Sequence, residues 1–188
     1  QLLARCFDET NDPDSALLFF RKSLEFPEVN PSIKALRMES RLTIAMIHYK
    51  QGKLNDAEQN FLLVAQEMGS AGFLRQAVQS NFMLGDIYLQ YGNSRKAEEF
   101  YLIALQETGE MIKNLSYYRY DSLRYVVSIG SELYFPFPDN YIRSAIWKYQ
   151  SNITGKLFQL YRQREMYKQS MEYMILNAQA RDTLNALS

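Results

Sequence analysis

The side chains that most often carry chemistry are scarce in this chain of 188 residues. It has one histidine, His48, and one cysteine, Cys6. No phosphate-binding glycine loop, paired zinc ligands or glycine-flanked serine accompanies them. The sequons at Asn114 and Asn152 are too short to imply glycosylation by themselves. The sequence therefore predicts no catalytic residue, no metal site and no cofactor, and His48 is interpreted as a packing residue.

An acidic segment, Asp8–Ser15, superficially resembles a calcium-binding loop. The twelfth position of that loop is Phe19, where calcium needs a bidentate carboxylate. We therefore interpret the segment as a turn and helix cap. Asp12 or Asp14 would accept hydrogen bonds from the free amides of the helix that follows.

Charge and hydropathy exclude several classes of protein. Lys plus Arg equals Asp plus Glu at 21 each, so no strong positive field attracts a phosphate backbone, and we expect no nucleic-acid binding by this region. With 47% hydrophobic residues the chain can bury a core, yet it has no apolar run long enough to span a bilayer. Membrane attachment would need a segment outside this chain. A single cysteine excludes an internal disulfide and leaves the redox compartment undecided.

An internal repeat organises the chain. Four residue pairs recur at a stride of 40 positions: Gly52 with Gly92, Ala57 with Ala97, Phe61 with Tyr101, and Gly69 with Gly109. Such self-similarity is typical of stacked supersecondary units. The copies run from Leu42 to Gly69 and from Phe82 to Gly109, with apolar residues at helical spacing in both halves. We interpret each copy as a helical hairpin and not as two coincidentally similar helices.

Small and aromatic residues form the expected framework of these hairpins. Gly52 and Gly92 are predicted to end the first helix in the left-handed conformation, and Gly69 and Gly109 to end the second. Alanine or glycine lets the two helices lie close together, and an aromatic residue fills the gap between successive hairpins. The framework residues are Ala16, Phe20, Ala45, Gly52, Ala57, Phe61, Gly85, Tyr88, Gly92, Ala97, Tyr101 and Ala104.

Weaker copies are predicted at both ends. Ala16 and Phe20 repeat the spacing of Ala57 and Phe61, and the closing copy has serine in place of alanine and no turn glycine. Terminal units of a stack are commonly atypical. We divide the single domain 1–188 into units at about 1–30, 38–69 and 78–109, a divergent helical region 111–150, and a degenerate closing unit 151–188. The chain starts inside a helix, so we expect it to be either a piece of a larger protein or a mature chain whose leader has been removed.

The divergent region is rich in aromatic residues. It contains half of the 14 tyrosines and Trp147, with prolines at positions 136 and 138. We predict a helix from about 115 to 134, a bend, and a helix from about Asn140 that runs to Arg164 or breaks near Asn152. These aromatics either form the core of a divergent fourth unit or line a recognition pocket for a small ligand.

The best-defined copy resembles the tetratricopeptide repeat family. The family pattern is matched by Leu84, Gly85, Tyr88, Gly92, Ala97, Tyr101 and Ala104. The usual tryptophan is replaced by Asn81 or Arg41, the closing proline by glycine, and the stride of 40 exceeds the usual repeat of about 34 residues. The resemblance implies an all-α fold, a right-handed superhelix of antiparallel hairpins, of the long-repeat type. The additional residues would lengthen the helices around 69–79.

In this family the first helices of the hairpins line a concave groove that binds a peptide or helix. By that analogy the groove residues are Leu42, Met46, Tyr49, Lys50, Phe82, Asp86, Leu89, Gln90, Gln159, Arg162 and Gln163. Their mixture of apolar, aromatic and charged side chains suits an amphipathic protein segment. Each of them is equally well an ordinary solvated residue or a contact between repeats.

Two functions follow from the resemblance, and both are non-enzymatic. The closing stretch is similar to the last repeat of bacterial regulators in which the array precedes a membrane helix and a kinase or DNA-binding effector. In that case the array is a periplasmic sensory or interaction region used in signal transduction or transcription regulation. The alternative is a cytoplasmic adaptor or assembly scaffold. The sequence leaves the compartment undecided and leaves a homodimer open.

Overall fold

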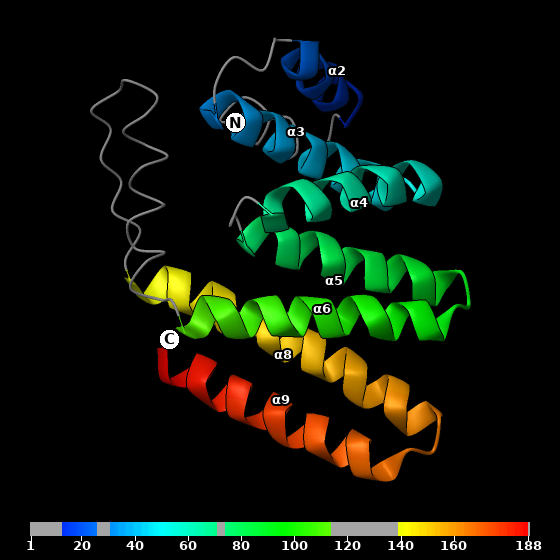
Figure 1. Ribbon diagram of the computed structural model, residues 1–188, viewed down its shortest axis with the longest axis vertical. Coiled ribbons are helices and arrows are strands. Elements are labelled where there is room, and N and C mark those ends of the chain that lie inside the picture. The colour runs from blue at the N-terminus through cyan, green and yellow to red at the C-terminus, as the bar shows by residue number, and fades with distance from the viewer. Residues whose placement is uncertain (1–12, 26–30, 71–73, 114–138, 188) are drawn as a thin grey trace. The chain divides into compact units, whose positions relative to one another are not determined.

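The computed structural model describes residues 13–25, 31–70, 74–113 and 139–187 (Figure 1). Within these ranges there are seven helices and no strand, so the all-α prediction is confirmed. The helices are α2 (Pro13–Glu25), α3 (Pro31–Lys50), α4 (Leu54–Ser70), α5 (Leu74–Gln90), α6 (Ser94–Lys113), α8 (Asp139–Gln163) and α9 (Tyr167–Leu187).

The chain divides into two compact units, and the first ends at Ser80, within α5. In the first unit α2 packs against α3, and α3 packs against α4. In the second unit α6 packs against α8, and α8 packs against α9. The pairs α3–α4 and α8–α9 are antiparallel helices joined by tight turns (Figure 1).

Three of the turns between helices share one hydrogen-bonding pattern. In the α3–α4 turn the Gly52 amide donates to the Tyr49 carbonyl at 3.0 Å, and the next amide donates to the carbonyl five residues before it at 2.9 Å. These bonds satisfy the carbonyls at the end of α3 and require a residue in the left-handed conformation. Gly92 repeats the pattern between α5 and α6, and Glu165 repeats it between α8 and α9. The closing hairpin therefore keeps the turn without its glycine.

The φ angles of the three turn residues are 74° at Gly52, 73° at Gly92 and 58° at Glu165. We expect Glu165→Gly to raise the free energy of unfolding by up to about 1 kcal/mol, because a side chain is unfavourable at positive φ. The greater conformational freedom of glycine in the unfolded chain offsets part of this stabilisation. Thermal unfolding measures the change. As a control, Glu172→Gly within α9 should lower stability by about 1 kcal/mol. A loss of stability in Glu165→Gly would contradict the prediction.

The prediction that Gly69 and Gly109 end their helices is wrong. Both glycines lie inside helices. Helix α4 ends at Ser70, one residue after Gly69, and α6 ends at Lys113, four residues after Gly109. Gly109 has no positive φ. Thr108 and Met111 are buried on either side of it, at 0% and 2% exposure, so their packing carries α6 past the glycine.

The divergent region is only partly described. The helix predicted at 115–134 and the bend that follows it lie outside the described residues. The next helix, α8, begins at Asp139, close to the predicted start at Asn140, and continues through Asn152 to Gln163 without a break. The alternative with a break near Asn152 is therefore wrong. Ile146, Ile153 and Leu157 are buried along its length and account for its continuity.

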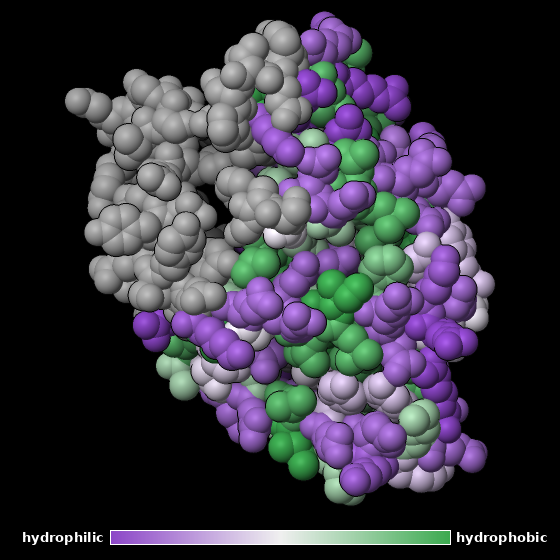
Figure 2. Space-filling view, viewed as in Figure 1, coloured by the Kyte–Doolittle hydropathy of each residue, from purple (hydrophilic) through white to green (hydrophobic). Residues whose placement is uncertain are grey.

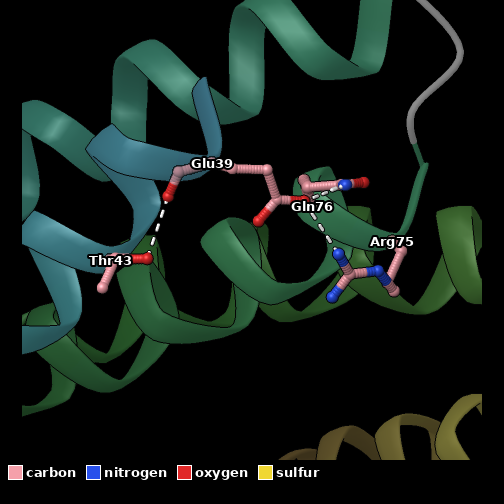
Figure 3. Close-up of polar contacts among 4 residues, drawn as sticks. All are labelled: Glu39, Thr43, Arg75 and Gln76. Carbon is pink, nitrogen blue, oxygen red and sulfur yellow. Dashed lines mark hydrogen bonds and ion pairs between the residues drawn. The ribbon is translucent and has the colours of Figure 1, made fainter. Parts of the chain in front are cut away.

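Polar contacts fix the start of α5 in the first unit. The Glu39 carboxylate on α3 accepts a hydrogen bond from Arg75 at 2.8 Å and another from the Gln76 side-chain amide (Figure 3). The backbone carbonyl of the same residue accepts a hydrogen bond from the Thr43 hydroxyl at 3.0 Å. Glu39 is therefore held by its own helix and by the first turn of α5.

Candidate functional site

The predicted groove residues of the first unit lie on the second half of α3. Leu42 is 4% exposed, and a side chain so deeply buried in the core cannot contact a partner. Met46 and Tyr49 are half-buried, and Lys50 is exposed. The accessible part of this surface therefore consists of Met46, Tyr49 and Lys50.

The predicted groove residues of the second unit lie on α5 and α8. Phe82, Asp86 and Leu89 are half-buried, whereas Gln90 at the end of α5 is exposed. The three residues of α8 are all exposed, namely Gln159, Arg162 and Gln163. On the face shown in Figure 2, hydrophobic side chains stand in separate clusters among hydrophilic ones.

Asp86 links the three helices of the second unit that carry or support this surface. Its carboxylate accepts a hydrogen bond from the Tyr101 hydroxyl of α6 at 2.5 Å. The same oxygen lies 2.7 Å from the Lys156 ammonium of α8. The Phe82 ring lies 5.8 Å from the Tyr101 ring, centroid to centroid. The acidic charge is thus compensated within the protein, and α8 is placed beside α5.

A second polar cluster joins α6 to α8. The Glu98 carboxylate of α6 accepts hydrogen bonds from the Tyr161 hydroxyl at the end of α8 and from the Arg164 guanidinium in the turn that follows α8. The Tyr161 ring stacks on the Tyr173 ring of α9, with centroids 5.3 Å apart and planes 8° from parallel. One cluster therefore holds α6, α8 and α9 at the same end of the hairpins.

The ionisation of these groups follows from burial and from their partners. Burial opposes the charged form of Glu98, but the hydrogen bonds from Tyr161 and Arg164 and the charge of Arg164 outweigh it, so the pKa of Glu98 is lowered. Burial, followed by the hydrogen bond to Glu98, raises the pKa of Tyr161 far above its usual value. Burial and the charge of Glu98 also raise the pKa of Tyr173. Glu98 therefore remains a carboxylate and both phenols remain protonated at neutral pH.

His48 and the sequon of Asn152, which could carry chemistry by residue type, contribute to packing in the structure. His48 is 6% exposed, and burial lowers its pKa. Thr154, which completes the sequon of Asn152, is fully buried, donates to the Gln150 carbonyl at 2.7 Å and accepts from the Asn177 side-chain amide at 3.2 Å. The sequon of Asn152 therefore contributes Thr154 to the contact between α8 and α9. Cys6 and Asn114 lie outside the described residues.

The described residues contain neither a cluster of metal ligands nor a membrane-spanning helix. No three His, Cys, Asp or Glu side chains among them gather as ligands for a metal ion. None of the described helices combines the length and the apolar character needed to cross a membrane.

Sequence reasoning missed the residues that connect the hairpins. Glu98, Lys156 and Arg164 match no repeat pattern, and their partners stand far away in the sequence. In the sequence Tyr161 occupies the repeat position of Tyr88, which indicates a packed aromatic residue but does not identify Glu98 as the acceptor.

Helical hairpins with repeated turns define a class: a helical-repeat protein. Within it, residues 78–107 match the model of the tetratricopeptide repeat family. This match lies inside the unit predicted at 78–109, and the predicted resemblance to tetratricopeptide repeats is confirmed. Proteins of this family generally mediate protein binding and are typically non-enzymatic.

A comparison of structures supports the same fold. The chain is similar to the crystal structure of BtubC (BKLC) from P. vanneervenii, with a TM-score of 0.50 and 14% sequence identity over 97% of this chain and 78% of that chain. At this identity the similarity shows the fold alone. No curated protein sequence matches the chain.

Proposed function

We propose that the surface formed by α5 and α8 in the second unit binds an amphipathic segment of a protein partner. The observation that carries the proposal is the ion pair of Asp86 with Lys156, which joins α5, with its half-buried Phe82 and Leu89, to α8, with its exposed polar side chains. Apolar anchors bordered by polar groups are the usual composition of a protein-binding surface.

The charges favour a segment of mixed character. Because Lys156 and Tyr101 already satisfy Asp86, that carboxylate offers little charge to a basic partner. Arg162 and Lys50 are exposed, but they belong to different units, and among the predicted groove residues each unit has one of these two cations. In the first unit Met46, Tyr49 and Lys50 form a smaller surface of the same type. Shape and apolar anchors therefore contribute more to recognition than charge does.

Leu89→Asp is expected to weaken partner binding at least tenfold, because a carboxylate would replace an apolar anchor in the centre of the surface. A library of displayed random dodecapeptides supplies the probe, and calorimetry with a selected peptide measures the affinity. Leu102→Asp, an exposed position on α6, provides the matched control and should leave the affinity unchanged. Equal binding by both variants would place the binding surface elsewhere.

We further propose that the chain is the sensory or interaction region of a larger bacterial signalling or transcription-regulatory protein. The support is the similarity of the closing stretch, which forms α8 and α9, to the last repeat of such regulators. The complete gene product tests this proposal. A membrane helix followed by a kinase or DNA-binding domain supports it and places the array in the periplasm, whereas a stop codon soon after Ser188 favours a cytoplasmic adaptor.

A further inference from the structure

The outer face of α9 carries an uncovered apolar stripe. Tyr167 is 67% exposed, Met171 59%, Met174 48% and Ile175 50%. Ala178 is exposed on the same side, one turn after Met174. Because these residues are spaced by three and four positions, they occupy one face of the helix over about three turns. The opposite face of α9 packs on α8, where Ser170 and Ala180 are buried.

The repeated turns relate positions of this face to positions on α6. Met171 follows Glu165 at the distance at which Glu98 follows Gly92, and Met174 follows it as Tyr101 follows Gly92. On α6 the first of these positions meets the next helix, because Glu98 contacts the end of α8, whereas Tyr101 packs against Phe82 of α5 within its own hairpin. The part of the stripe around Met171 therefore corresponds to the surface on which α6 accepts another helix.

The α9 face differs from the corresponding α6 face at the residue that selects the neighbouring helix. Glu98, which accepts hydrogen bonds from Tyr161 and Arg164, is replaced by Met171. The face of α9 therefore lacks the charged acceptor that selects a tyrosine and an arginine on the helix above it. Methionine adapts its shape to different apolar surfaces. The apolar stripe on α9 therefore fits an uncharged, apolar face of another helix.

We propose that the occupant is the same face of a second copy of this chain, with the two α9 helices antiparallel about a two-fold axis near Ile175. A face that meets its own copy must be self-complementary. Met171 would pack over the small Ala178 of the second copy. Lys168 and Asp182 are both exposed and lie equally far from Ile175 on one flank, so Lys168 of each copy lies opposite Asp182 of the other.

The contact is small. Five side chains on one helix cover less than the roughly 800 Å² per partner of a standard stable interface, so we expect a weak and reversible dimer. Sedimentation of the chain from about 5 to about 500 µM spans the Kd expected for such an interface. The weight-average mass should rise toward that of a dimer over this range, and a chain that stays monomeric throughout overturns the proposal.

Substitutions test the surface itself. Met171→Glu should weaken association at least tenfold, because two carboxylates would be brought into an apolar contact. Leu102→Glu, an exposed apolar residue on α6, is the control and should not change it. Circular dichroism verifies that both variants keep their helices. Equal association by the two variants would exclude the α9 face.

Charge exchange tests the antiparallel arrangement. Lys168→Glu and Asp182→Lys should each weaken the dimer, and the double variant should restore it, because each pair then has opposite charges again. In a Cys6→Ser background, Lys168→Cys combined with Asp182→Cys should form an intermolecular disulfide, whereas Lys168→Cys alone should not. Crosslinking by the single variant alone would show a parallel arrangement and contradict the proposed geometry.

Discussion

Replacing Gly85 by alanine is expected to lower the free energy of unfolding by roughly 2 to 3 kcal/mol. A Cβ atom at this position would lie 2.4 Å from Cε1 and 2.6 Å from Cδ1 of the Tyr101 ring. The ring cannot move away easily, because Tyr101 is fully buried and its hydroxyl is bonded to Asp86. Relief therefore requires α5 and α6 to separate, which opens the contact between the two helices of the hairpin.

Gly109→Ala is the matched control for this prediction. Gly109 also lies inside a helix of the second unit, but a Cβ there would meet no atom within 4 Å. Alanine should therefore stabilise α6 by roughly 0.5 to 1 kcal/mol, since it restricts the unfolded chain and favours the helix. Chemical denaturation of the two variants should give changes of opposite sign.

A double substitution identifies the cause. In the Gly85→Ala background, Tyr101→Val removes the ring that the new methyl group would strike, so the two changes should cost less together than the sum of their separate effects. Strictly additive effects would mean that the loss in Gly85→Ala comes from somewhere other than the Tyr101 ring.

The contact of Gly85 with Tyr101 also shows how far the sequence predicts the fold. The repeated pattern correctly identified Gly85 as a point of close approach and Gly92 as a left-handed turn residue, because both depend on backbone geometry that only a few residue types permit. The position of Tyr101 was predicted less well. Its ring was expected between successive hairpins, yet it contacts Phe82 and the Gly85 position within its own hairpin.

Contacts between hairpins could not be predicted in the same way. Periodicity indicates which face of a helix is buried, but it does not say which residue of a distant helix lies opposite. Glu98 and its partners Tyr161 and Arg164 come from different helices, and several residue pairs could satisfy a half-buried carboxylate equally well. The end of α6 was mispredicted for a related reason, because the glycine signal at 109 is local and the burial of Met111 is tertiary.

Stability of the chain is expected to fall as the pH rises from about 4.5 to about 7, through the ionisation of Glu107. Burial raises the pKa of this carboxyl to about 7, the hydrogen bond from the Asn81 amide opposes the rise, and the charge of Glu110 adds to it. Below the pKa of Glu107 in the unfolded chain, this carboxyl is protonated in both states, so it does not lower the free energy of unfolding. Between the two values only the unfolded state loses its proton, which favours unfolding, and above pH 7 the loss is complete.

Glu107→Gln should remove this dependence. Glutamine keeps an oxygen that accepts the Asn81 hydrogen bond, which joins their side chains at 2.9 Å, but it carries no charge. At pH 8 the variant should be more stable than the parent chain by roughly 1 to 3 kcal/mol, whereas at pH 4.5 the two should be nearly equal. Urea denaturation at both pH values measures the difference.

Glu99→Gln removes the same formal charge from an exposed position of α6 and serves as the control. Its effect on stability should be small at both pH values, because an exposed carboxylate keeps its hydration in the folded state. If Glu107→Gln stabilises the chain equally at pH 4.5 and pH 8, the gain comes from improved packing and not from ionisation. A difference that grows with pH in Glu107→Gln alone would locate the pH dependence at the contact between α5 and α6.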